Sequence, residues 1–461
     1  MPTAPILASR LPRRVAAGAL LALHLTHAHA LQPNPPLPHT SELTPSPETA
    51  PPAIDAKPPC RPISGDEVPA LAALDTFMLE FLCEHDISAA TVAITRRGNL
   101  IYNRAFGWSD QARTTPLAPD ALMRIASVSK PITAAAVREL IAEGAFTLDT
   151  HAFDVGQPNA DQPAGGLLAL KPFPSLGDLR IADITVRHLL EHKGGWDRDV
   201  AGDLTYMELA IASAMGIDCP PGRENTLRFI LGKPLQHEPG TKSAYSNIGM
   251  LALGLIVEQH RAQPLDTVLD DIMQRASVDP HDHAAGRTLK EHQDPREPWY
   301  DSVALAPSVI DPGTLVPAPY GSWDHEARIG QGGQITTAAA LARFAARFYV
   351  NGPNIGMPRP DDDEGTWRWN HSGSLVGTNS LIRQRGDGYT FAVILNKRPS
   401  NQDWLGEIRR TIDAILDDLP QDLHTPQELH SPQDQARESP SPDNPRPASP
   451  PPDNRPSSAA E

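Results

Sequence analysis

Apolar and β-branched residues follow two different periods along the central part of this chain. Residues 69–85 (PALAALDTFMLEFLCEH) carry apolar side chains at helical spacing, which predicts a helix. Residues 90–109 and 378–399 each read as a pair of strands, broken at Arg97-Gly98-Asn99 and at Gly386-Asp387-Gly388. Short glycine-containing breaks between strand-like runs are typical of β-hairpins. We therefore expect one hairpin near each end of this region.

Between the two hairpins the pattern is mainly helical, with Pro- and Gly-rich loops separating the segments. Helical spacing is found in residues 185–192, 204–216, 226–233, 248–262, 336–352 and, after the second hairpin, 404–419. Strands at both ends and helices in the middle predict an α+β fold. Its expected core is one antiparallel sheet built from both ends of the region and flanked by helices, with a helical subdomain beside it.

Proline crowds the sequence on both sides of this region, and the chain of 461 residues contains 49 prolines. Residues 31–66 and 421–461 cannot bury enough apolar surface to offset the entropy lost on ordering. We predict a disordered linker over residues 31–66, a globular domain over residues 67–420 and a disordered tail over residues 421–461. A spacer role is favoured over partner binding for both proline-rich tracts.

The first thirty residues have the layout of a secretory signal. Arg10, Arg13 and Arg14 precede the apolar run VAAGALLALHL, and the small-residue sequence AHA ends at Ala30. This pattern predicts a signal peptide over residues 1–30 and a periplasmic or secreted protein. The apolar run is about half of the roughly 20 residues that span a bilayer. We therefore expect no stable membrane insertion after cleavage.

Charge and cysteine content narrow the function classes. The formal net charge of −16 argues against nucleic acid as a partner, because phosphate binding needs a surplus of basic residues. Cys60, Cys83 and Cys219 are too few and too scattered for a disulfide framework or a thiolate metal site. One bridge formed after export and no bridge at all are both consistent with their spacing.

One segment near the first hairpin carries candidate chemistry. In MRIASVSKPITAAAVRELIAEG, residues 123–144, Ser127 precedes Lys130 by three positions at the start of a predicted helix. Residues three apart share one helix face, so the amine can reach the hydroxyl. The unpaired N–H groups at a helix start also favour developing negative charge. A serine and a lysine at this spacing are common by chance, so the pair needs partners elsewhere in the chain.

Two further segments supply such partners. Tyr245 and Asn247 lie two residues apart in a loop that leads into an apolar helix, and His371, Ser372 and Gly373 begin a predicted strand. Tyr349-Val350-Asn351 repeats the Tyr-x-Asn spacing. It lies at a predicted helix end where Asn-Gly acts as a cap, so Tyr245 is the better candidate.

With these segments the sequence resembles the serine β-lactamase and penicillin-binding-protein superfamily, in particular its class C-like branch of D,D-peptidases and esterases. Its Ser-x-x-Lys element and the triad at residues 371–373 correspond to known elements of that superfamily. The resemblance extends over roughly residues 69–419 and is carried by five ordered segments. These are RIASVSKPITAAAV, ITVRHLLEHKGGWD, PGTKSAYSNIG, GQGGQITTAAALARF and HSGSLVGTNS. It implies a β-lactamase/transpeptidase-like fold.

The resemblance also implies a role for each of these residues. Ser127 would attack a carbonyl carbon and form an acyl-enzyme, with Lys130 and Tyr245 moving protons; which of the two is the base stays open. A neutral Lys130 at pH 7 requires its pKa to fall by about 3 from its usual value, which corresponds to about 4 kcal/mol.

Asn247 is expected to hydrogen-bond Lys130 and to orient a substrate amide. The backbone N–H groups of Ser127 and Ser374 would hold the oxyanion. Gly373 has no Cβ, which lets the strand edge approach the acyl group. No metal and no organic cofactor is implied.

The triad departs from its frequent form because it begins with His371 rather than a lysine. A neutral or partly charged imidazole attracts a substrate carboxylate less than a fixed ammonium does. We therefore expect slow or no penicillin turnover. The expected activity is hydrolysis of an amide or ester in a small-molecule or peptide substrate, cell-wall-derived peptides included.

Two other functions compete with this one. A catalytically slow penicillin-binding or scaffolding protein would keep the pocket and use its proline tracts for partners. A zinc peptidase would use His188 and His192, because residues 188–192 (HLLEH) match an inverted zinc-protease pattern with both histidines on one helix face. No third ligand stands out in the sequence, so the zinc site is the weaker hypothesis.

Overall fold

The computed structural model describes residues 61–155, 165–360 and 362–419, which all belong to one unit of the chain. The predicted signal peptide, most of the predicted linker and the predicted C-terminal tail lie outside the described residues. Cys60 lies outside them as well, whereas Cys83 and Cys219 are free thiols. Within the described part of the chain, no helix is both long and apolar enough to cross a membrane.

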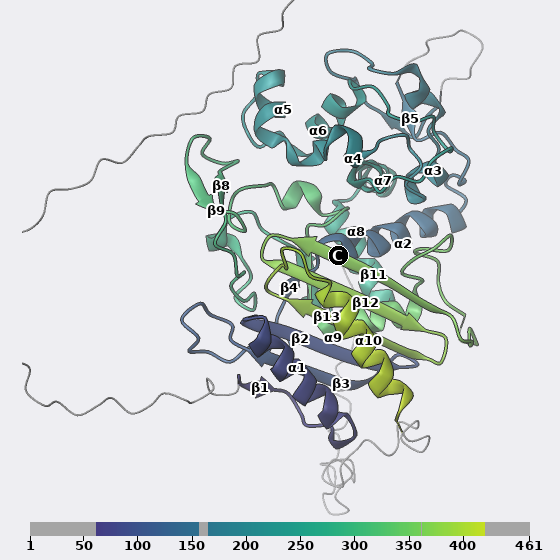
Figure 1. Cartoon of the computed structure of the whole chain (residues 1–461). Coiled ribbons are helices and arrows are strands. Elements are labelled where there is room, and N and C mark those ends of the chain that lie inside the picture. The colour runs from purple at the N-terminus through teal and green to yellow at the C-terminus, as the bar shows by residue number, and fades with distance from the viewer. Residues whose placement is uncertain (1–60, 156–164, 361, 420–461) are drawn as a thin grey trace, which may run out of the picture. The chain divides into compact units, whose positions relative to one another are not determined.

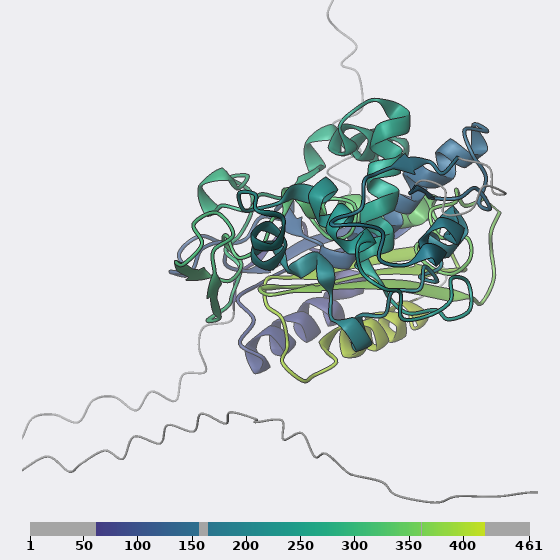
Figure 2. The same ribbon diagram turned by 90° about the horizontal axis from the view of Figure 1, so that it is seen from above.

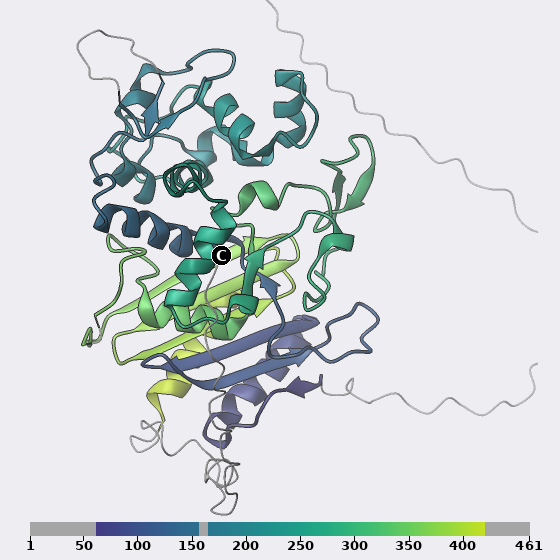
Figure 3. The ribbon, with the colours of Figure 1, turned by 180° about the vertical axis from the view of Figure 1, so that it is seen from behind.

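A six-stranded antiparallel sheet forms the centre of the fold, with strand order β1-β3-β2-β13-β12-β11 (Figure 1). Its strands are β1 (Ile63–Ser64), β2 (Ala89–Arg96), β3 (Asn99–Gly107), β11 (Arg368–Leu375), β12 (Thr378–Arg385) and β13 (Tyr389–Leu395). Strands from the two ends of the domain meet where β2 pairs with β13, as the purple and yellow-green ribbons show in Figure 3. The predicted α+β fold, with one sheet built from both ends, is confirmed.

Both predicted hairpins are present. The turn between β2 and β3 contains Arg97 at φ +48° and Gly98 at φ +82°. Two successive positive φ angles match the right-handed twist of the flanking strands, which is why short turns of this kind close hairpins. The structure corrects the predicted start of the domain at residue 67, because β1 pairs with β3 through Ile63 and Ser64 and therefore belongs to the sheet.

Each face of the sheet buries a separate core, because successive side chains of a strand point to opposite faces. On β2, Val92 and Ile94 join the core formed with helices α1 (Ala72–Glu84) and α10 (Trp404–Asp417). Ala93 faces the other core, which α9 (Ala338–Arg347) covers. Seen from above, α1 and α10 lie together on one side of the strands (Figure 2).

The remaining helices form the helical subdomain and its connection to the sheet. They are α2 (Ser129–Ala142), α3 (Val186–Leu190), α4 (Arg198–Ala201), α5 (Glu208–Met215), α6 (Gly222–Leu231), α7 (Asn247–Arg261) and α8 (Leu265–Arg275). Short strands accompany them: β4 (Met123–Arg124), β5 (Phe153–Asp154), β6 (Leu168–Ala169), β7 (His283–Ala285), β8 (Leu305–Pro307), β9 (Leu315–Pro317) and β10 (Gln334–Thr336).

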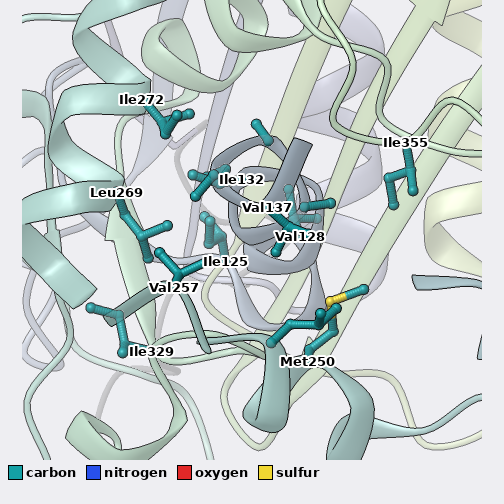
Figure 4. Packing of buried hydrophobic residues seen from close by; sticks show 14 of the residues in the cluster. Ile125, Val128, Ile132, Val137, Met250, Val257, Leu269, Ile272, Ile329 and Ile355 are labelled. Carbon is teal, nitrogen blue, oxygen red and sulfur yellow. The ribbon is translucent and has the colours of Figure 1, made fainter. Parts of the chain in front are cut away.

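Helix α2 lies at the centre of the larger core. It packs against α7 and α8, and ten of its residues are buried. Figure 4 shows Ile132 and Val137 of α2 among side chains from α7 and α8, such as Val257 and Leu269. A helix buried on nearly all sides is held firmly, since removing a single large core side chain typically costs about 2–5 kcal/mol. The chemistry-bearing residues at its start are therefore rigidly placed.

Candidate active site

Ser127 lies in a single 3₁₀ turn, residues Ala126–Val128, between β4 and α2. Its neighbours Ile125 and Val128 are fully buried and anchor the turn, while Ser127 itself stays partly accessible. Ala126 adopts φ +47°, a left-handed conformation that costs an alanine roughly 1–2 kcal/mol. Because the residues on either side are buried, they hold the strained turn in place. The Ser127 hydroxyl is thereby fixed at the edge of the packed core, where it remains accessible.

Lys130 lies one turn further on and is completely buried. Its Nζ donates to Ser127 Oγ at 3.0 Å and to the backbone oxygen of Gln331 at 2.6 Å. Burial lowers the pKa of Lys130 to about 7, with the positive charge of Arg198 adding to the effect and the negative charge of Asp203 opposing it. A large fraction of the amine is therefore neutral near pH 7, within contact of the serine oxygen.

Tyr245 approaches the same oxygen from the loop before α7. Its hydroxyl donates to Ser127 Oγ at 2.7 Å. The ring lies between three basic groups: its centroid is 5.0 Å from Lys130 Nζ, 4.5 Å from the Arg198 guanidinium carbon and 4.8 Å from the His192 ring centroid. Burial raises the pKa of Tyr245 to about 12, so its hydroxyl keeps its proton at neutral pH.

Asn247 is close to this group but makes a different contact from the one predicted. Its Nδ2 donates to Asp203 Oδ2 at 2.6 Å. Its Oδ1, the atom that could accept from Lys130 Nζ, is buried and has no hydrogen-bond partner among the described residues. Asp203 Oδ1 in turn accepts from the backbone N–H and hydroxyl of Thr205. The predicted Asn247–Lys130 hydrogen bond is therefore wrong for this structure, and Asn247 is held by a carboxylate instead.

The edge strand β11 brings the triad of residues 371–373 to the serine. Alternate side chains of a strand point to opposite faces, which separates the predicted residues into two pairs. A Cβ on Gly373 would lie 2.9 Å from Ser127 N and 2.2 Å from Ile125 O. Ser372 and Ser374 instead line a cavity beside the start of α10. The Ser372 and Ser374 hydroxyls therefore lie on the face of β11 away from Ser127. Ser374 can contribute to the group around Ser127 only through its backbone.

His371 precedes Gly373 by two residues and shares its face of the strand. Desolvation lowers the pKa of His371, and the neighbouring positive charges of Lys130 and His192 lower it further. The ring is therefore neutral near pH 7, as expected for a group that attracts a substrate carboxylate weakly. Its Nδ1 lies 3.2 Å from the backbone oxygen of Ser372.

Sequence reasoning missed Arg198 and Asp203 and named His192 only as a candidate zinc ligand, although all three shape the environment of this group. None of them lies in the Ser-x-x-Lys, Tyr-x-Asn or strand motif, and all three come from the helical subdomain. They come close to Tyr245 and Asn247 only because residues 192–203 fold against the loop before α7. The signal that could have pointed to His192 is the segment ITVRHLLEHKGGWD, which contains this histidine two residues before the glycine pair Gly194-Gly195.

The predicted zinc motif does not form. Helix α3 ends at Leu190, and His192 follows it at φ +55°, so the two histidines do not share a helix face. His188 Nδ1 accepts from the backbone N–H of Thr185 in a capping box, whereas His192 Nδ1 accepts from the N–H of Ser246. Among the described residues no group of three or more His, Cys, Asp or Glu side chains is arranged to hold a metal.

Comparisons with known proteins agree with this fold. Esterase EstB from Burkholderia gladioli is 32% identical over 213 residues, which cover 45% of this chain and 50% of that protein. The chain spans about half the length of the curated relatives it matches.

Two solved structures share the fold at a TM-score of 0.51. The octameric penicillin-binding protein homologue from Pyrococcus abyssi is 22% identical, covering 75% of this chain and 77% of that one. The D-amino acid amidase from Ochrobactrum anthropi SV3 is 17% identical, covering 76% and 98%. At these identities the likeness concerns the fold.

One family model covers all of these motifs. The model described as Beta-lactamase matches residues 70–373, a range that contains Ser127, Lys130, Tyr245 and the triad on β11. The chain belongs to the beta-lactamase family.

Proposed function

We propose that this protein is an exported serine hydrolase that cleaves an ester or amide through an acyl-enzyme on Ser127. The observation that carries the proposal is the contact of one serine oxygen with both Lys130 Nζ at 3.0 Å and Tyr245 Oη at 2.7 Å. A serine hydroxyl is a weak nucleophile on its own and needs an adjacent group to take its proton. Such a group is present here in contact with it.

The shifted pKa values of Lys130 and Tyr245 assign a different proton transfer to each residue. With its pKa lowered to about 7, neutral Lys130 takes the Ser127 proton as the oxygen attacks the carbonyl carbon. Tyr245, whose pKa is raised to about 12, stays protonated and donates a proton to the leaving oxygen or nitrogen. The proton that Lys130 took from Ser127 then passes to the deprotonated Tyr245 oxygen, which restores both groups while Ser127 carries the acyl group. In deacylation water takes the place of the leaving group: it gives a proton to this pair as it attacks the acyl carbon, and Ser127 Oγ regains a proton from the pair as it leaves.

The developing oxyanion needs donors that are fixed before the reaction. The backbone N–H of Ser127, beside which Gly373 leaves room, is one such donor. The backbone N–H of Ser374 on the sheet edge is the proposed second donor. Asn247 and Arg198 lie on the helical side of the same group, where they can contact the substrate beyond the scissile bond.

The preferred substrate is a neutral ester or amide. His371 is uncharged near pH 7, which removes the fixed cation that would favour a carboxylate next to the scissile bond. The likeness to a protein named esterase supports an ester. Cell-wall-derived peptides are a further candidate substrate class.

An active-site-directed fluorophosphonate tests this function. The purified full chain should be labelled at one site, Ser127→Ala should not be labelled, and the control Ser372→Ala should be labelled normally because its hydroxyl lies on the other face of β11. Equal labelling of Ser127→Ala and the unmodified chain would overturn the proposal. Hydrolysis of p-nitrophenyl esters, a chromogenic cephalosporin and D-alanyl-D-alanine peptides then ranks the substrate classes.

The second candidate, a slow penicillin-binding or scaffolding protein, gives a different result in the same experiment. It would be labelled by a fluorescent penicillin at Ser127 but would turn over none of the three substrate classes. Export is tested separately by mass spectrometry of the protein recovered outside the cytoplasm, whose N-terminus should follow Ala30.

A further inference from the structure

A cavity of about 360 Å³ lies on the α10 face of the edge strand β11, beside the start of α10. β11 is the last strand of the sheet (Figure 1), and its residues Ser372 and Ser374 line the cavity. Sites for small molecules typically measure roughly 300–1,000 Å³. The cavity is therefore large enough for one small ligand.

Asn379 on β12 supplies a buried amide to the wall of this cavity. The residue is only 4% exposed, and no other described residue forms a hydrogen bond with its side chain. Asn379 pairs with Ser374 across the two strands, and the side chains of paired residues lie on the same face of a sheet. A buried amide without a partner is costly, because it has lost its hydrogen bonds to water. The fold gains nothing from this group, whereas a ligand that bonds to it would.

Two further polar groups of the wall are unoccupied. Arg409 lines the cavity from α10, and within the described part of the chain no hydrogen bond or ion pair engages its guanidinium. Gln402 accepts from Trp404 Nε1 through Oε1, which leaves its Nε2 without a partner among the described side chains. Arg409, Gln402 and Asn379 therefore offer N–H donors that the protein itself does not use.

The charges of the wall balance. Of the described residues that line the cavity, Arg409 is basic and Asp403 is acidic. Asp403 Oδ1 also accepts from the backbone N–H of Gly406 and so caps α10. One charge of each sign gives little net attraction for either an anion or a cation. The wall therefore favours a neutral ligand.

The uncharged part of the wall combines hydrogen-bonding groups with apolar ones. An amide both donates and accepts, as does a hydroxyl, so a ligand with several hydroxyls can pair with Asn379 and Gln402 at several points. Leu381, Pro399 and Leu405 contribute apolar surface to the same cavity. A sugar ring carries hydroxyls around its rim and has apolar C–H faces. It matches both parts of this wall.

Ser374 connects the cavity with the candidate active site. It lines the cavity, and its backbone N–H is the proposed second oxyanion donor. Because β11 is the edge strand, no further strand separates the cavity from a group held at that donor. We propose that the cavity holds the sugar part of the substrate, so that the ester cleaved at Ser127 is an O-acylated saccharide. This inference rests on the proposed function and specifies its substrate class.

The reaction with such an ester needs water as its second reactant. Ser127 Oγ bonds to the carbonyl carbon, and the bond between that carbon and the sugar oxygen breaks. Tyr245 donates its proton to the sugar oxygen, so the sugar leaves with a free hydroxyl. Water then releases the acyl group as a carboxylic acid.

Acetate release from three monoacetylated sugars tests the proposal. The 6-O-acetyl esters of glucose, galactose and N-acetylglucosamine are compared with cyclohexylmethyl acetate, which has a six-membered ring and a primary ester but no hydroxyls. For at least one sugar, kcat/KM should exceed that of cyclohexylmethyl acetate at least about tenfold, as one or two additional hydrogen bonds would give. Cleavage of all three sugars no faster than cyclohexylmethyl acetate would overturn the proposal.

Variants of the wall locate the sugar. Arg409→Met and Asn379→Leu should each reduce the preference for the acetylated sugar over cyclohexylmethyl acetate at least about threefold. Arg410→Met is the matched control, because Arg410 is exposed on the same helix and does not line the cavity. It should keep the preference of the unmodified chain. An unchanged preference in both cavity variants would overturn the proposal.

Thermal unfolding of Asn379→Leu distinguishes a ligand-binding amide from a structural one. The variant should unfold at the same temperature as the unmodified chain or at a higher one, since it replaces an amide that has no partner among the described residues. A lower unfolding temperature together with an unchanged sugar preference would assign Asn379 to the fold and contradict the proposal.

Binding to Ser127→Ala separates this inference from the proposed function. The variant cannot form the acyl-enzyme, so titration calorimetry measures binding alone, and an acetylated sugar should bind at least about tenfold more tightly than cyclohexylmethyl acetate. That result without fluorophosphonate labelling of the unmodified chain would count against the proposed function alone. Labelling and hydrolysis of p-nitrophenyl esters without any sugar preference would count against this inference alone.

Discussion

The Tyr245 hydroxyl donates to Ser127 Oγ at 2.7 Å although the two residues are 118 positions apart in the sequence. The helical subdomain supplies the tyrosine, and the turn before α2 supplies the serine. Lys130 contacts the same oxygen from within α2. Two elements that are distant in sequence thus converge on one atom.

Tyr245→Phe should lower kcat/KM by about 10²–10⁴-fold, because the phenol is the proposed proton donor to the leaving group. The ring would stay between His192 and Arg198, so stability should change little. Steady-state kinetics on a p-nitrophenyl ester measures the effect. Tyr349→Phe is the matched control: its hydroxyl contacts Asp363, and it should keep full activity. A fully active Tyr245→Phe would remove the phenol from the mechanism.

The pH dependence of acylation should follow the ionisation of Lys130. Because its pKa is lowered to about 7 and the neutral amine is the proposed base, kcat/KM should fall about tenfold for each pH unit below 7. Asp203 raises this pKa and Arg198 lowers it, so their removal should act in opposite directions. Asp203→Asn should move the acidic limb to lower pH and Arg198→Gln to higher pH, each by roughly half a unit. Shifts of the same sign in both variants would contradict this assignment.

Lys130→Met should stabilise the protein near neutral pH while abolishing activity. The unfolded chain keeps a lysine pKa near 10.4, so between pH 7 and about 10 it binds a proton that the folded state has lost. The free energy of unfolding of the unmodified chain therefore rises with pH in this window, and the cost of burying the charge is largest below pH 7.

Denaturant unfolding at pH 7 and pH 10 measures this effect. The stability advantage of Lys130→Met should shrink by about 4 kcal/mol between the two pH values, since the methionine has no proton to bind. A constant difference between the two proteins would mean that Lys130 is charged in the folded state at pH 10.

Gly373→Ala should abolish fluorophosphonate labelling and destabilise the domain by about 1–3 kcal/mol, as expected when a methyl group is forced into packed backbone. The added Cβ would lie 2.2 Å from Ile125 O and 2.9 Å from Ser127 N, so either β11 or the turn before α2 must move. Thermal unfolding and labelling rate measure the two effects. Ser372→Ala, one residue away on the opposite face, should leave both unchanged; a normal labelling rate in Gly373→Ala would show that the edge strand tolerates displacement.

Local pattern determined much of this protein. The strand-like runs in residues 90–109 and 378–399 and the glycine turns between them predicted both hairpins, because strand propensity and turn geometry depend on neighbouring residues alone. The spacing of Ser127 and Lys130 likewise placed both on one side of a helix start, since three residues make nearly one turn. The residues that carry the proposed chemistry were therefore identified from the sequence.

Their surroundings depended on the tertiary structure. The partner of Asn247, the basic groups around Tyr245 and the separation of His192 from His188 follow from how residues 186–206 fold against α7, which no local period encodes. The pKa of Lys130 near 7 is of the same kind, because desolvation is the sum of all atoms packed around the amine. Sequence spacing fixed which groups can share a face, and packing alone fixed which of them meet and in which charge state.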